Sequence, residues 1–257
     1  MLNFELFSRY GQTLSAQQQL NVTSSIPTLK LDYRLPHVVF WGRINGLKND
    51  YLLCRGFKDA LTSIFFFSID GLEWAELPDY CPAVAEMVML FRQPFMGDPS
   101  FQYKTDDEDG FSFSEAQRLA AIVDLIANDT SVVPRRAYKK SVEGTVVKNK
   151  LYEGLPPQHC TDLSHFMHLR PISTDITDPN TIAEKGLDLV FDCLESIKDD
   201  IPHGCWAVEK FETESLVGLR SLLWLGYVFF ASFEEPFYTG AYFGDGIYNN
   251  DILFMLN

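Results

Sequence analysis

Histidine and cysteine gather in one short segment of the chain, at His159, Cys160, His165 and His168. On a helix, His165 and His168 would share a face, because residues three apart are neighbours there. Two imidazoles, with Cys160 or Asp162 as a third ligand, would suit zinc, which accepts nitrogen, sulfur and carboxylate oxygen. The spacing matches no common zinc motif, however, and a half-buried helix whose histidines pack beside apolar neighbours explains it more simply. We therefore expect no metal site in this segment.

Thiol chemistry is the second kind considered. His203 and Cys205 are two residues apart and would share a face on a strand, but Pro202 and Gly204 favour a turn instead. The sequence also lacks a phosphate-binding GxxxxGK[ST] loop, a GxSxG nucleophile turn and an HExxH zinc motif. We expect no catalytic, cofactor-binding or metal-binding residues and predict that the protein is not an enzyme. The alternative is a metal-dependent or thiol enzyme that uses the histidines and cysteine of segment 159–168.

Two β-meanders are predicted to frame the chain. Runs rich in β-branched and aromatic residues predict the first meander over residues 37–44, 51–55 and 64–69. Asn45-Gly46 predicts a type I′ hairpin turn, because both central positions of that turn need positive φ, and Lys48-Asn49-Asp50 extend it. Four further runs predict the second meander, over residues 206–211, 216–223, 226–233 and 238–243.

Amphipathic helices are predicted before and between the meanders. Residues 1–30 form an N-terminal helical lead in which Ser15 caps a helix. Helices are also predicted over residues 83–91, from Ser114-Glu115 onward with Leu119, Ile122, Val123 and Ile126 on one face, within 155–169, and over 181–198. Pro, Ser, Thr and Asp over 171–180 predict a linker, at which the domain of residues 31–257 would subdivide. The expected class is α+β, with antiparallel β-meanders and packed amphipathic helices.

Acidic residues dominate the charge of the chain, with 35 Asp and Glu against 21 Lys and Arg, a formal net charge of −14. Nucleic acids and anionic membranes need clustered positive charge, so neither partner is expected. No run approaches the ~20 apolar residues that cross a bilayer, and no secretory signal is evident. The five cysteines are odd in number and widely spread, which favours free thiols in a reducing compartment. We expect a protein of the cytoplasm or of an intracellular structure.

Aromatic residues make up 14% of the chain, which suits either a thick core or extensive protein contacts. Trp41 stands beside Gly42 in a predicted strand. The glycine would open a slot for a partner segment or, as we favour, let Trp41 pack over it in the core. Phe95 and Met96 lie in a loop that Gly97 and Pro99 make rigid, where they either contact a partner or anchor the core.

Five apolar residues stand just before the last residue, Asn257; they are Ile252, Leu253, Phe254, Met255 and Leu256. A chain end frays unless it docks, and burying such side chains stabilises by roughly 1.5–3 kcal/mol each before entropy is counted. We expect this tail to dock as an extended segment that locks the second meander, and we include it among the candidate protein-interface residues with Trp41, Phe95 and Met96.

Six segments occur in one order along residues 30–257. They are Val38-Val-Phe-Trp-Gly-Arg-Ile-Asn-Gly46 with Asp50-Tyr51, Phe95-Met-Gly-Asp-Pro-Ser100, a helix from Leu119 that closes at Pro134-Arg135, Tyr152-Glu-Gly-Leu155 with Phe166 and His168, Asp200-Ile-Pro-His-Gly-Cys-Trp206 with Leu219-Arg-Ser-Leu-Leu-Trp-Leu-Gly226, and Asn250-Asp-Ile-Leu-Phe-Met-Leu256. Together they resemble the radial spoke head protein 9 family of motile cilia. The first segment is also similar to radial spoke head proteins 4 and 6, which implies wider kinship.

The resemblance implies a non-enzymatic structural subunit of the radial spoke head, in the axoneme of the cilium or flagellum. That head contacts the central-pair apparatus and relays mechanical signals to the dynein arms that control motility. The implied partners are spoke head proteins of the 4/6 class and further head subunits, and no cofactor is implied. A cytosolic protein–protein adaptor outside cilia is the remaining alternative.

Overall fold

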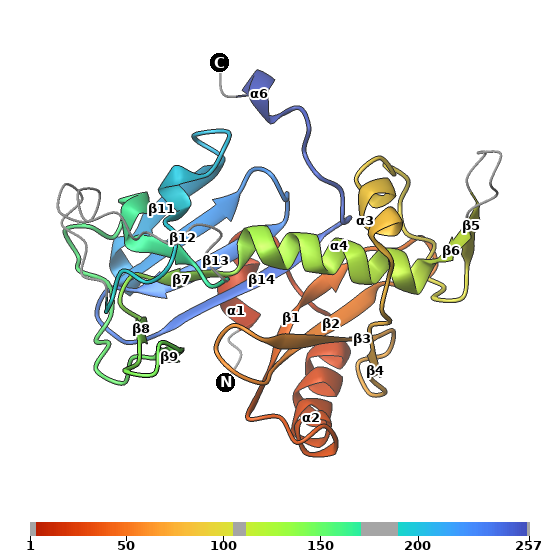
Figure 1. Cartoon of the computed structure of the whole chain (residues 1–257), viewed down its shortest axis with the longest axis horizontal. Coiled ribbons are helices and arrows are strands. Elements are labelled where there is room, and N and C mark those ends of the chain that lie inside the picture. Colours follow the sequence, from red (N-terminus) through yellow and green to blue (C-terminus); the bar gives the residue numbers. More distant parts are fainter. Residues whose placement is uncertain (1–3, 105–111, 171–189, 256–257) are drawn as a thin grey trace.

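A mixed sheet of eight strands forms the centre of the molecule (Figure 1). The computed structural model of the chain describes residues 4–104, 112–170 and 190–255. The strands lie in the order β11-β12-β13-β14-β1-β2-β3-β4. Along the chain they are β1 (His37–Ile44), β2 (Tyr51–Phe57), β3 (Ser63–Ser68), β4 (Ala75–Glu76), β11 (Trp206–Phe211), β12 (Leu216–Ser221), β13 (Tyr227–Ser232) and β14 (Tyr238–Gly244). Both predicted β-meanders and the predicted α+β class are confirmed.

The two meanders join through one parallel pair of strands, which the sequence did not indicate. β1 runs parallel to β14, with Gly42 opposite Tyr242, whereas the other neighbouring strands of the sheet run antiparallel. Gly42 lies at a bulge in the β1–β2 pairing, and a Cβ at this position would collide with the carbonyl group of Tyr242. Glycine therefore permits the close backbone approach that joins the two halves of the sheet.

The connection between β1 and β2 is a loop over residues 45–50, as expected, but the type I′ turn is wrong because neither Asn45 nor Gly46 has positive φ. Asn45 donates its backbone N–H to the carbonyl of Gly244 (2.9 Å), and Leu47 donates its N–H to the carbonyl of Phe95 (2.8 Å). These bonds to distant segments replace the bonds that a tight reversal would make. The loop is therefore shaped by β14 and by the segment that begins at Phe95.

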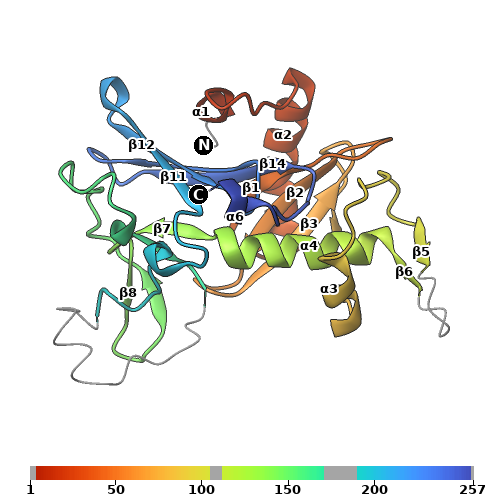
Figure 2. The same cartoon turned by 90° about the horizontal axis from the view of Figure 1, so that it is seen from above.

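Helices cover both faces of the sheet, as Figure 2 shows. On one face, α1 (Phe4–Ser8) and α2 (Ala16–Asp32) pack over a core that includes Phe7, Phe40 and Phe230. On the other face, α3 (Pro82–Val88) and α4 (Glu115–Thr130) pack over a larger core that includes Trp41 and Tyr242. The sheet is thus the middle of three layers.

The caps of the two long helices follow the sequence. Ser15 caps α2 as predicted: its side chain accepts the N–H of Gln18, and the Gln18 side chain accepts the N–H of Ser15. Ser114 and Gln117 make the same reciprocal pair at the start of α4. Such a capping box satisfies two donors that the first turn of a helix would otherwise leave unbonded.

Two-stranded ribbons lie beside the sheet. They pair β5 (Gln102–Lys104) with β6 (Ser112–Ser114), β7 (Val132–Pro134) with β10 (Phe166–His168), and β8 (Tyr138–Lys140) with β9 (Val146–Lys148). The short helix predicted within 155–169 is wrong. That stretch contains turns, the 3-10 helix Leu163–His165 and the strand β10, because Phe166 enters the core through pairing with β7.

Two further predictions fall partly outside the described residues. Residues 171–189 lie outside them, including the predicted linker and the start of the predicted helix over 181–198. From residue 190 onward that helix is wrong, since the stretch contains only the 3-10 helix Ile197–Asp199. The chain end forms the short helix α6 (Ile252–Met255), so the extended tail that we predicted is also wrong. None of the helices in the described part of the chain is both long and apolar enough to cross a membrane.

Candidate functional site

Helix α4 carries two fully buried charged residues against the sheet. Glu115 and Arg118 are both 0% exposed and share the face on which the predicted apolar residues are buried. Burying a charge is costly unless hydrogen bonds replace its water. The groups that bond to these two side chains therefore show how the buried charges are stabilised.

Glu115 accepts hydrogen bonds from three neighbouring segments. The hydroxyls of Tyr51 and Tyr103 each donate to it at 2.6 Å. The backbone N–H groups of Met96, Gly97 and Asp98 donate at 2.8, 2.7 and 3.1 Å. Burial by itself would raise the pKa of Glu115, but these bonds, led by those of the two tyrosines, hold it below its ordinary value. The carboxylate thus stays ionised and fixes the loop 95–98.

Arg118 completes this arrangement through Tyr103. Its guanidinium donates to the Tyr103 hydroxyl at 2.8 Å and to the carbonyl of Gln93 at 2.5 Å. It also lies over the Phe95 ring, 4.2 Å from the ring centre, where a cation interacts favourably with the ring face. We call these bonded residues, Glu115, Arg118, Tyr51, Tyr103 and loop 95–98, the Glu115 network.

Phe95 and Met96 belong to the loop 95–98 that the Glu115 network holds in place. Phe95 is 0% exposed and anchors the core, whereas Met96 is partly exposed. Gly97 has φ +81, and a Cβ there would collide with the backbone of Asn49, whose side chain donates to the Gly97 carbonyl at 3.1 Å. The loop is therefore rigid, as predicted, and it packs directly against the loop 45–50.

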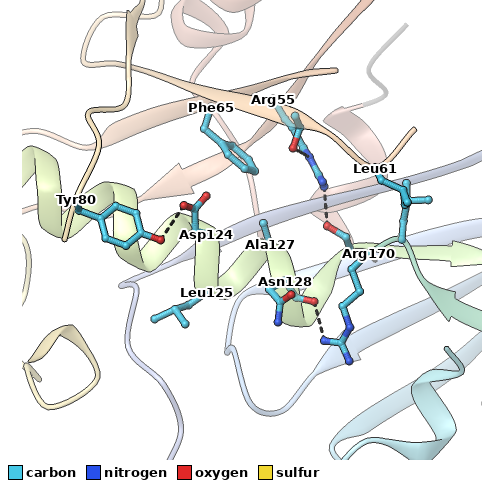
Figure 3. Close-up of a pocket in the computed structure, with 12 residues that line it drawn as sticks. Arg55, Leu61, Phe65, Tyr80, Asp124, Leu125, Ala127, Asn128 and Arg170 are labelled. Atoms are coloured by element: carbon cyan, nitrogen blue, oxygen red, sulfur yellow. Dashed lines mark hydrogen bonds between the residues drawn. The ribbon is translucent and has the colours of Figure 1, made fainter. Parts of the chain in front are cut away.

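A cavity of about 380 Å³ opens near the other end of α4 (Figure 3). Its most buried charge is Arg55 on β2, which is 9% exposed. The Arg55 guanidinium donates to the hydroxyls of Ser63 (2.9 Å) and Ser131 (2.6 Å) and lies over the rings of Phe57 and Phe65. Burial lowers the pKa of Arg55. We call this space the Arg55 cavity.

The wall of the Arg55 cavity holds charges of both signs. The Tyr80 hydroxyl donates to Asp124 at 2.9 Å, and Arg170 donates to the carbonyl of Asn128 at 3.0 Å (Figure 3). Asp124 is exposed at the rim, yet crowding by surrounding protein atoms raises its pKa, against the effect of the Tyr80 bond. Burial and the neighbouring Asp124 carboxylate raise the pKa of Tyr80 to about 12.

The chemistry of the Arg55 cavity is that of a polar packing space. Ser63 and Ser131 accept hydrogen bonds from a cation, which makes their oxygens weaker nucleophiles. Neither histidine nor cysteine is among the described residues of its lining. The polar groups bond to one another and hold β2 and β3 to α4 and to the loop that follows it.

The cysteine and histidine side chains of segment 159–168 lie in three different surroundings. Cys160 is 2% exposed, and its thiol donates to the carbonyl of Pro157 at 3.2 Å. His168 is 1% exposed, and its Nε2 lies 2.8 Å from the carboxylate of Asp200. His159 and His165 remain together nearer the surface, so the ligand set Cys160–His165–His168 considered from the sequence does not form.

The two residues considered for thiol chemistry, His203 and Cys205, also lie in different surroundings. Cys205 is 1% exposed, and burial raises the pKa of its thiol to about 11. A reactive cysteine needs a lowered pKa, since the thiolate is the nucleophile. His203 lies on the exposed turn that was predicted from its neighbours. All five cysteines are free thiols, as predicted.

The remaining candidate interface residues lie in the core or at the chain end. Trp41 is 6% exposed and packs edge-on against Phe65, which confirms the core interpretation that we favoured. Ile252 is 3% exposed and belongs to the same core, whereas Phe254 is 81% exposed. Leu256 lies outside the described residues, as do the side chains of Leu253 and Met255.

Comparison with known proteins agrees with the segments singled out in the sequence. The chain is 33% identical to the radial spoke head protein 9 homolog of Danio rerio over 270 residues, which cover 99% of this chain and 97% of that protein. It is also 33% identical to the homologs of Mus musculus and Homo sapiens, over 100% of this chain and 98% of each. No family model matches the chain. Identity at this level along the whole length places the chain in the radial spoke head protein 9 family.

Proposed function

We propose that this protein is a structural subunit of the radial spoke head in the axoneme of motile cilia or flagella. In this role it helps to assemble the spoke head and to relay signals from the central-pair apparatus to the dynein arms. Its direct partners are spoke head proteins of the 4/6 class and further head subunits. The observation that carries the proposal is the 33% identity to radial spoke head protein 9 homologs along the whole chain.

The packing of the molecule suits a part that transmits force without changing shape. One sheet runs through both halves, with helices over each face. The Glu115 network ties loop 95–98 to α4 and to β2 through buried bonds of 2.6–3.1 Å. Protein interiors packed in this way have low compressibility and transmit strain. A stiff block of this kind supports the structural role.

Replacement of the native protein by a tagged copy in motile ciliated cells tests the proposal. The tag should label the axoneme and co-purify with spoke head proteins. Loss of the protein should remove density from the spoke head in electron tomograms and leave cilia that form but beat without coordination. A tag that stays in the cytosol and spares the axoneme would instead identify an adaptor outside cilia.

We also propose that the partly exposed Met96 and the chain end at residues 252–256 contact a neighbouring head subunit. Ile252 is buried in the core and orients α6, while Phe254 on the same short helix is 81% exposed. Trp41 and Phe95 are buried in the core of the chain, so we do not include them in this contact.

Phe254→Ala tests this contact, with Leu90→Ala as the matched control because Leu90 is 82% exposed and lies elsewhere, after α3. The Phe254 variant should lower co-purification with other head subunits while its thermal melting stays unchanged. Equal recovery of both variants would remove the chain end from the interface.

A further inference from the structure

Three polar side chains of the segment before β10 are spaced by three residues, at His159, Asp162 and His165. The backbone bonds follow the same spacing: His159 N–H donates to the carbonyl of Pro156 at 3.0 Å, Asp162 N–H to that of His159 at 3.1 Å, and His165 N–H to that of Asp162 at 3.0 Å. These bonds close separate turns, since only Leu163–His165 form a 3-10 helix and Asp162, its N-cap, has extended backbone angles. The successive turns bring the three side chains close to one another.

The three side chains present their ligand atoms to one another. One nitrogen from each histidine and one Asp162 oxygen all lie within 4.8 Å of each other. The rings of His159 and His165 are parallel to within 2°, with centres 4.7 Å apart. The distance from Asp162 Oδ2 to His165 Nδ1 is 3.9 Å. Two imidazoles and a carboxylate thus lie close together, with the two rings stacked.

One carboxylate oxygen of Asp162 is available to an ion, because its two oxygens have different surroundings. Oδ1 accepts the backbone N–H of Ser164 at 2.9 Å, which caps the 3-10 helix Leu163–His165. That bond fixes the orientation of the carboxylate and leaves Oδ2 on the side of the histidines. A second bond of this kind commonly orients carboxylates that bind metals. The cap explains the aspartate alone and does not require two histidines beside it.

From this geometry we propose that His159, Asp162 and His165 form a site for a zinc ion, with water at the fourth position. Zinc takes histidine nitrogen and carboxylate oxygen at about 2.0–2.2 Å, so neighbouring ligand atoms of a tetrahedral site are about 3.4 Å apart. Binding therefore requires the two stacked rings to turn toward Asp162 and the present separations to shorten. His159 and Asp162 are exposed and His165 is partly exposed, so these rotations meet little resistance.

The inferred ligand set differs from the set suggested by the spacing of residues in the sequence. Cys160 and His168 lie in the same segment, but the first is buried against its own backbone and the second pairs with Asp200. The site has an open position, so it would pin the segment 156–165 and leave one ligand place for a neighbouring group.

Titration of the purified full-length protein with ZnCl₂ in chelator-treated buffer tests the site. We expect one ion per chain with a Kd of ~10 µM or tighter. His159→Ala and His165→Ala should each weaken binding by about 100-fold or more, since loss of a residue that only orients a ligand typically weakens it 10–100-fold. His203→Ala is the matched control, because it removes an exposed histidine of another turn, and it should bind as the unmodified chain does.

Cobalt provides a second readout that does not depend on stability. Co²⁺ in a four-coordinate site should give strong visible absorption that both histidine variants lose and His203→Ala keeps. Thermal melting without metal, equal in all four proteins, would establish that the variants fold. Zinc binding that is absent, or that falls equally in His203→Ala, would overturn the assignment and leave an aspartate cap beside two stacked histidines.

Discussion

Two arginines lie between the sheet and α4, and their surroundings differ. Arg118 belongs to the Glu115 network, is 0% exposed, and shares the Tyr103 hydroxyl with a buried carboxylate. Arg55 is 9% exposed, faces a cavity of about 380 Å³, and bonds to two neutral serine hydroxyls. Both guanidiniums lie over aromatic rings. Similar stacking therefore accompanies a closed arrangement with a buried carboxylate at one end of α4 and an open arrangement with an exposed carboxylate, Asp124, at the other.

The Glu115 network and the Arg55 cavity should respond differently to the loss of a side chain. In the Glu115 network, each group is held by others, so the loss of one leaves its partners buried and unbonded. In the Arg55 cavity there is room for water, which can replace a lost partner. We therefore expect the first region to fix the shape of the molecule and the second to tolerate change.

The largest effect should come from exchanging each arginine for an apolar residue of similar length. Arg118→Met leaves the Tyr103 hydroxyl and the Gln93 carbonyl without their charged donor, and each such bond contributes about 1.5–3 kcal/mol, so the variant should lose about 3–5 kcal/mol. Arg55→Met also removes two hydrogen bonds, but water in the cavity can reach Ser63 and Ser131, so stability should change by less than about 1 kcal/mol. Urea unfolding of the two variants measures both values. Equal losses would show that the cavity depends on its arginine as strongly as the network does.

Glycine substitutions sharpen the same contrast at the backbone. Gly97→Ala brings strain at φ +81 together with a collision with the Asn49 backbone, so we expect a loss of about 2–4 kcal/mol. Gly144→Ala is the matched control, since Gly144 has φ +84 and only the Lys140 side chain nearby, at 3.9 Å. It should lose about 1 kcal/mol from strain alone. Thermal melting of the two variants separates the effect of the collision from that of backbone strain. Similar losses of stability would show that loop 95–98 is not tightly packed against Asn49.

A smaller effect is expected at the cavity wall. Tyr80→Phe removes the hydrogen bond to Asp124, which lies at the exposed rim, and should destabilise by about 0.5–1 kcal/mol. Tyr103→Phe in the Glu115 network removes a buried bond of 2.6 Å and should cost more, about 2–3 kcal/mol. Urea midpoints of the two variants rank the regions, and a larger loss at Tyr80 would reverse our ranking.

The smallest signal should appear as two opposite responses to acid. The pKa of Glu115 is lowered in the folded chain, so its stabilisation is present above the ordinary value of 4.5 and is lost as pH falls through the folded pKa. The pKa of Asp124 is raised above 3.8, so the folded chain gains stability from this group as pH falls through its folded pKa. The stability lost through Glu115→Gln should therefore shrink as pH falls from 6 to about 3. Over the same fall in pH, the free energy of unfolding of the unmodified chain should rise relative to that of Asp124→Asn. Parallel curves for the two variants would contradict these directions.

Local features of the fold were predictable because each has a local cause. The runs that became β1, β13 and β14 are rich in residues that fit a pleated surface. The start of α4 follows from Ser114 and Gln117, which bond only within one turn. Such signals lie within a few residues of the structure that they determine, so a single sequence contains them.

Features that depend on distant segments were missed for a physical reason. The parallel pairing of β1 with β14 depends on Gly42 meeting Tyr242, and no short window contains both. The buried charge of Arg55 did leave a trace, since it interrupts the apolar run of β2, whereas Arg118 follows the polar start of α4 and carries no such signal. A helical spacing pairs His165 with His168, whereas in the structure His165 stacks on His159, because the segment folds as separate turns around an extended Asp162.

The parallel pairing of β1 with β14 has a consequence for biosynthesis. The paired residues Gly42 and Tyr242 are 242 − 42 = 200 positions apart. At about 5–20 residues per second, a ribosome needs roughly 10–40 s to make the chain between them. During that interval β1 presents an unpaired edge, which is a template for association with other nascent chains. Cells that make this protein should therefore protect it with a chaperone until translation is almost complete.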